Sequence, residues 1–157
     1  MYRKNGLGLA AIVLVMFLAC ATQEQIDVDR DFVVQTINYG NGNGSGIKIT
    51  EFRGSVTDIR IPSRIQGLPV TAIGSSAFAR RQLTSVVIPN TVSYIGNSAF
   101  AMNSITSLTI PGSVTRIGNS AFARNLITSV TIPGSVTYVG TMAFDAAVSV
   151  HRMNGTN

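Results

Sequence analysis

Side chains that could carry catalysis are sparse in this sequence. The 157 residues include one histidine, His151, and one cysteine, Cys20. A serine nucleophile needs a histidine base held by a carboxylate, and no acidic residue lies between Asp58 and Asp145. The same gap removes the paired carboxylates that glycoside hydrolysis uses. The sequence therefore predicts no enzymatic activity and no cofactor.

Two short motifs resemble ligand loops only in part. The segment DVDRDF, residues 27–32, begins like a calcium loop, but Phe32 occupies the place of the required glycine and Asn38 that of the final glutamate. A glycine-rich stretch precedes a predicted strand and lacks the Gly-Lys pair of a phosphate loop; its glycines are Gly40, Gly42, Gly44 and Gly46. We predict neither a metal site nor a nucleotide site.

The amino terminus has the pattern of an export signal. Arg3 and Lys4 precede an apolar run, Leu7 to Ala19, of thirteen residues, which is the length of a signal-peptide core and short for a membrane span. We predict a signal peptide over residues 1–19. An ordinary secretory peptide cut nearby and an uncleaved anchor are the alternatives.

The four residues that end this run suggest lipidation. Phe-Leu-Ala-Cys at 17–20 resembles a bacterial lipobox, with Phe17 where leucine is usual. The resemblance implies an acylated Cys20, a membrane anchor, and export to the bacterial outer membrane or cell surface. Residues 20–31 are polar and are predicted to form a lipidated spacer.

Charge gives little indication of a nucleic-acid partner. Without residues 1–19 the chain keeps ten basic and seven acidic side chains, a net charge of 10 − 7 = +3. It has no run of lysine and arginine, so nucleic-acid binding is not expected.

Internal repeats dominate the rest of the chain. The pair Ala-Phe begins at 77, 99, 121 and 143, which is a spacing of 22 residues each time. Ile-Gly or Val-Gly recurs with the same period, at 73, 95, 117 and 139. We predict a repeat solenoid over residues 56–145, because a 22-residue unit has too few apolar side chains to fold alone and must stack on its neighbours.

Each unit is expected to form one closed coil. Segments such as LTSVVI, ITSLTI and ITSVTI predict a short strand, which the following proline ends. Asn-Ser-Ala-Phe predicts a single helical turn that places Phe100 or Phe122 in the core. Residues 32–55 predict a β-hairpin that caps the first coil, and residues 146–157 an imperfect carboxyl-terminal cap.

The repeat LTSVVIPNTVSYIGNSAF, residues 83–100, resembles the BspA-like bacterial leucine-rich repeat, over about residues 50–144. The resemblance implies a leucine-rich repeat solenoid, with one β-strand plus a short helical or irregular return per unit, that acts in adhesion rather than catalysis. Asn103 and Asn125 match the family's inter-coil asparagine, whereas Arg81 departs from it.

Three sets of residues share repeat positions outside the predicted core. Two sets lie on the strands and predict a protein-binding face or a merely exposed sheet; they contain Ser85, Ser107 and Ser129, and Val87, Thr109 and Thr131. The third set contains Tyr94, Arg116 and Tyr138, where the arginine would lie between two tyrosines as a binding stripe or a structural ladder.

The combined prediction is a surface lipoprotein that binds an extracellular or host protein. The alternative is self-assembly into a homo-oligomer through open solenoid ends. Residues 146–152 are expected to pair with the last coil and to leave an apolar edge exposed near Val139 and Met142.

Overall fold

A computed structural model describes residues 28–40 and 44–153 of the chain. The predictions for the signal peptide, for Cys20 and for most of the spacer concern residues outside this part. Within the described residues, no helix has the length and apolar character needed to cross a membrane.

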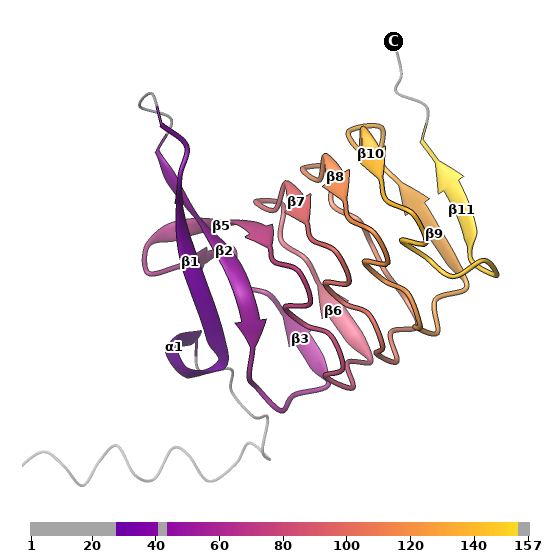
Figure 1. Cartoon of the computed structure of the whole chain (residues 1–157), viewed down its shortest axis with the longest axis horizontal. Helices are drawn as coiled ribbons and strands as arrows, with labels where there is room; N and C mark the ends of the chain where they lie inside the picture. The colour runs from indigo at the N-terminus through magenta and orange to yellow at the C-terminus, as the bar shows by residue number, and fades with distance from the viewer. Residues whose placement is uncertain (1–27, 41–43, 154–157) are drawn as a thin grey trace, which may run out of the picture.

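The predicted amino-terminal hairpin is confirmed. A helical turn, α1 (Val28–Asp31), leads into β1 (Phe32–Asn38), which pairs antiparallel with β2 (Ser45–Phe52). β2 then pairs in parallel with β5 (Leu68–Ile73), so the hairpin forms the first layer of the coil stack (Figure 1). A short strand, β4 (Arg64–Ile65), pairs antiparallel with β5.

The repeats form the predicted solenoid, whose coils carry strands on two faces (Figure 1). One face continues the sheet from β5 through β7 (Tyr94–Ile95) and β8 (Arg116–Ile117) to β10 (Tyr138–Val139). We call it the ladder face.

The other face, which we call the strand face, contains four strands and the segment 106–110. There β3 (Asp58–Arg60) pairs with β6 (Ser85–Val87), and β9 (Ser129–Ile132) pairs with β11 (Ser149–Arg152). All of these pairs are parallel, as successive coils of a solenoid require.

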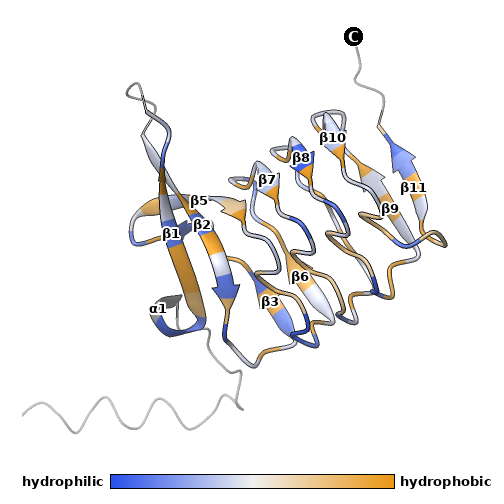
Figure 2. Cartoon of the chain, viewed as in Figure 1, coloured by the Kyte–Doolittle hydropathy of each residue, from blue (hydrophilic) through white to orange (hydrophobic). Residues whose placement is uncertain are grey.

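A column of phenylalanines runs through the core between these faces. Phe100 and Phe122 are 0% and 1% exposed, which confirms that both point inward. Their ring centroids lie 5.2 Å apart and their planes differ by 4°. The column runs through Phe52, Phe78, Phe100, Phe122 and Phe144. In Figure 2 apolar residues recur at equivalent places in successive coils, as the 22-residue period predicts.

The asparagine predicted to link coils is present at two positions. Asn103 Nδ2 donates to the carbonyls of Phe78 and Phe100, at 2.8 and 2.9 Å. Asn103 Oδ1 accepts the backbone N–H groups of Arg81 and Leu83. Asn125 repeats the bonds to two phenylalanine carbonyls.

Arg81 occupies the equivalent position one coil earlier. Its guanidinium bonds Glu51 at 3.2 Å, so its side chain joins the first coil to the hairpin by a salt bridge instead.

The return segment of each coil is irregular, which is one of the two forms that the family resemblance implies, and no regular helical turn forms at Asn-Ser-Ala-Phe. Ser98 and Ser120 have φ of 53°, in the left-handed region that interrupts a right-handed helix. The N–H groups of Ser98 and Phe100 donate to the next coil, to Asn119 O and Ala121 O, both at 2.8 Å. These inter-coil bonds alternate with turn bonds inside the segment, from Ala99 N–H to Gly96 O and from Ala101 N–H to Ser98 O.

Of the three predicted strand segments, LTSVVI and ITSVTI form β6 and β9, but no strand forms in ITSLTI, residues 105–110. Within the described chain, the backbone of residues 106–110 makes no hydrogen bond to β6 or β9. This coil is joined to the preceding one on both sides of the segment. Before it, Ser104 N–H donates a hydrogen bond to Leu83 O, and after it β8 pairs with β7. Between these fixed points the coils separate and leave grooves, so the ladder is interrupted.

The carboxyl-terminal tail pairs with the preceding coil, with Val150 opposite Val130. Val148 is half-buried against the core, whereas Val150 is 47% exposed. Met142 is 70% exposed, whereas Val139 is partly buried against the core, so the exposed apolar edge expected near both residues is confirmed only at Met142.

Candidate protein-binding surface

The predicted strand-face residues lie together on one side of the solenoid. The hydroxyls of its serines and threonines make no hydrogen bond to any other described residue; they belong to Ser85, Ser107, Ser129, Thr109 and Thr131. Val87 lies on the same face and is 39% exposed. This part of the face is therefore rich in hydroxyls without a partner in the described chain, and charged side chains lie at its two ends, in β3 and β11.

On the ladder face, in contrast, hydroxyls form hydrogen bonds inside the protein. Ser93, Thr115 and Thr137 each donate to a backbone carbonyl one coil earlier, at 3.2, 3.1 and 3.2 Å. These hydroxyls clamp adjacent coils together. Thr84, at the start of β6, makes the same kind of bond to Thr57 O at 3.1 Å, so the contrast concerns the five strand-face hydroxyls named above.

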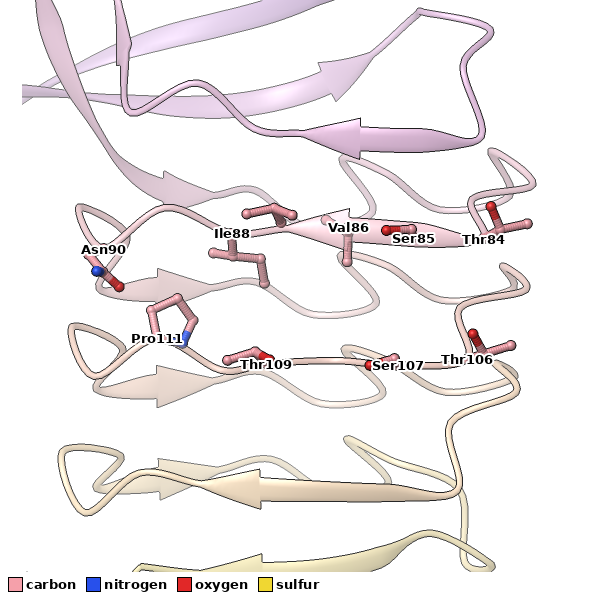
Figure 3. Close-up of a pocket in the computed structure, with 10 residues that line it drawn as sticks. Thr84, Ser85, Val86, Ile88, Asn90, Thr106, Ser107, Thr109 and Pro111 are labelled. Carbon is pink, nitrogen blue, oxygen red and sulfur yellow. The ribbon is translucent and has the colours of Figure 1, made fainter.

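Two grooves flank the unpaired segment of the strand face. The first, of about 470 Å³, lies between β6 and residues 106–111, where Ser85 and Thr84 line one side and Thr106, Ser107 and Thr109 the other (Figure 3). The second, of about 490 Å³, lies between residues 108–112 and β9, and Met153 reaches it.

The backbone of residues 106–110 adds further binding capacity. Its N–H and C=O groups have no backbone partner elsewhere in the described chain. Such groups bond to water when they are exposed, and a ligand that replaces this water can bond to them directly. Side-chain hydroxyls and backbone groups therefore converge on the same two grooves.

Three residues of this surface were not among those predicted from the sequence. Thr84 and Thr106 line the first groove together with Asn90. Thr84, Thr106 and Thr128 share one repeat position, so the 22-residue period contained the signal.

The third predicted set also lies in register. Tyr94 pairs with Arg116, and Arg116 with Tyr138, along β7, β8 and β10. The Arg116 guanidinium carbon lies 4.6 Å from the ring centroid of Tyr138. A matching contact with Tyr94 is absent from the described residues, so the arginine stacks on one tyrosine rather than between two.

Other ionisable groups lie at the hairpin or in the outer strands of the strand face. Hydrogen bonding to Arg53 holds the pKa of Glu51 below its usual value, and the charges of Arg53 and Arg81 add to this effect. His151 is exposed in β11. Among the described residues, no three acidic, histidine or cysteine side chains are grouped as metal ligands. Cys20 lies outside the described residues.

A model of the BspA type leucine rich repeat region matches residues 30–151 in six copies. The chain therefore belongs to the family of BspA-type leucine-rich repeat proteins. No curated protein matches it.

Two solved structures show the same fold. A leucine-rich repeat protein of T. pallidum is 23% identical, with a TM-score of 0.64 over 78% of this chain and 62% of that one. The present chain thus spans less than two thirds of that protein. A leucine-rich repeat protein from Bacteroides capillosus ATCC 29799 is 25% identical, with a TM-score of 0.65 over 79% of this chain and 99% of that one.

Proposed function

We propose that this protein is a bacterial surface lipoprotein whose repeats bind an extracellular or host protein through the strand face. Membership of the leucine-rich repeat family supports protein–protein interaction. We choose the strand face because its hydroxyls and backbone groups lack hydrogen-bond partners in the described chain. The ladder face, in contrast, uses its hydroxyls internally.

The surface location and the anchor rest on the amino-terminal sequence. Cys20 follows the apolar run at the position that a lipobox requires. In this proposal acyl chains on Cys20 hold the protein at the membrane, and residues 21–31 separate the repeats from it. Replacing Cys20 with serine should abolish metabolic lipid labelling; labelling that persists would contradict the anchor.

Binding through the strand face can be tested with two matched double variants. Ser107→Glu with Thr109→Lys places opposite charges on the strand face, and Tyr94→Glu with Tyr138→Lys places the same charges on the ladder face. Extracellular proteins retained by the parent chain are identified first, and their affinities for both variants are then measured. Weakening by the strand-face variant alone supports the proposal, and weakening by the ladder-face variant alone contradicts it.

Self-assembly is the second candidate, because the last coil displays exposed apolar side chains. Met142 is 70% exposed and Val150 is 47% exposed. Exposed apolar residues beside a strand edge favour association. Light scattering distinguishes the candidates: a monomer at micromolar concentration contradicts self-assembly, whereas a defined oligomer that Met142→Lys dissociates supports it.

A further inference from the structure

The ladder face carries a row of tyrosine and cationic side chains that is interrupted only by Ala72. Parallel pairing aligns one position of each successive strand, in the order Lys48, Ala72, Tyr94, Arg116 and Tyr138. These residues come from β2, β5, β7, β8 and β10, which lie side by side in Figure 1. The tyrosine and cationic members define what we call the cationic row.

The hairpin adds a third tyrosine to this face. The hydroxyl of Tyr39 contacts Thr71 Oγ1 and lies close to Gly46, which is on the same side of β2 as Lys48. Every tyrosine in the described part of the chain is therefore on the ladder face. Tyr39 and Tyr138 are 46% and 42% exposed, so their rings are available to a partner.

The positive charge of the row is not neutralised within the described chain. Neither Lys48 nor Arg116 forms a salt bridge there. The sequence has no carboxylate side chain from residue 59 to residue 144, which covers β5, β7, β8 and β10. An acidic partner would therefore meet no like charge from these four strands.

The row is also held in place before any partner binds. Stacking on Tyr138 orients the Arg116 guanidinium. The clamps from Thr115 and Thr137 fix the spacing between the coils beside it. Tyrosine and arginine held rigidly in this way are typical of residues that dominate protein interfaces, because little conformational entropy is lost on binding.

We propose that the cationic row binds an acidic segment of a partner protein, at a site separate from the strand face. Arg116 can hold one carboxylate with two hydrogen bonds, and the tyrosine hydroxyls can donate further bonds. Lys48 lies three strand spacings from Arg116, about 14 Å, which equals about four residues of extended chain. The segment thus presents acidic residues four positions apart, which lie on one side of an extended peptide.

The test uses the full-length chain in neutral detergent and fluorescein-labelled peptides, with binding measured by fluorescence anisotropy. The probe has glutamate at every fourth position in a serine and threonine background, and its control has glutamine there. We expect the glutamate peptide alone to bind, and Arg116→Ala to weaken it by about fivefold or more. Arg116→Lys keeps the charge but loses the stacking, so an intermediate loss is expected.

Arg60→Ala is the matched control, because it removes the same charge from exposed β3 on the strand face. It should leave the affinity unchanged, as should the strand-face variant Ser107→Glu with Thr109→Lys. Unchanged circular dichroism melting establishes that each variant folds. Equal weakening by Arg60→Ala, equal binding of the glutamine peptide, or binding only to phosphatidylglycerol vesicles would overturn the proposal. None of these results bears on the strand face as a site for a different protein.

Discussion

The strand face and the ladder face are built from the same coils and nearly the same residue types, yet they differ in how the coils are joined. On the ladder face, paired strands and bonded hydroxyls hold every coil to the next, from β5 to β10. On the strand face, residues 106–110 are unpaired between two grooves. The ladder face thus joins the coils continuously, whereas the strand face leaves polar groups without a partner in the described chain.

Glycine explains part of this difference. A Cβ atom placed on Gly118 would lie 2.6 Å from the backbone nitrogen of Asn97, so only glycine allows this close approach. Gly96 and Gly140 make equally close approaches one coil to either side. The strand segments 84–88, 106–110 and 128–132 contain no glycine.

The largest expected loss of stability comes from a change in the core that supports both faces. Phe100→Ala should lower the free energy of unfolding by about 3–5 kcal/mol, because it removes a fully buried ring from a continuous stack. Urea denaturation followed by circular dichroism measures this change. Val87→Ala, at an exposed position, is the control and should change stability by about 0.5 kcal/mol at most. A small loss for Phe100→Ala would mean that the stack does not support the two faces.

The repeat period predicted this core but not the difference between the faces. The spacing of Ala-Phe was sufficient to place Phe100 and Phe122 inside. Nothing in residue type distinguishes Thr115, whose hydroxyl bonds a carbonyl, from Thr109, whose hydroxyl does not. That distinction depends on whether a carbonyl of the adjacent coil lies within reach, which the local sequence does not specify.

Three other features of the structure could not be predicted from the local sequence. Ser98 adopts a positive φ that is unusual for serine, so the local sequence favoured a helical turn. The strand at 107–109 had the right composition but lacks a neighbour at bonding distance. Lys48 joins the cationic row only through the pairing of β2 with β5, which local patterns do not specify.

A smaller loss of stability should follow from a substitution that forces the coils apart on the ladder face. Gly118→Ala is expected to cost about 2–3 kcal/mol, because the new methyl group meets backbone atoms of the adjacent coil that cannot move aside. Gly112→Ala is the matched control, since a methyl group added there would have no atom within 4 Å, and it should be close to neutral. Thermal melting of both variants measures the comparison. Equal melting temperatures for the two would show that close coil contact is not what distinguishes the ladder face.

The smallest expected change in stability comes from removing hydroxyls, and it allows the two faces to be compared directly. Thr115→Val with Thr137→Val removes two hydroxyls that bond backbone carbonyls, and it should cost about 1 kcal/mol in total. Thr109→Val with Thr131→Val removes two hydroxyls that have no partner in the described chain, and valine suits an exposed strand at least as well as threonine. This second variant should therefore leave the free energy of unfolding unchanged, while it weakens any partner that bonds to the strand face. Chemical denaturation of the two double variants gives the comparison without a ligand. Equal destabilisation would mean that the strand-face hydroxyls are also structural, and the proposal that they are kept for binding would then fail.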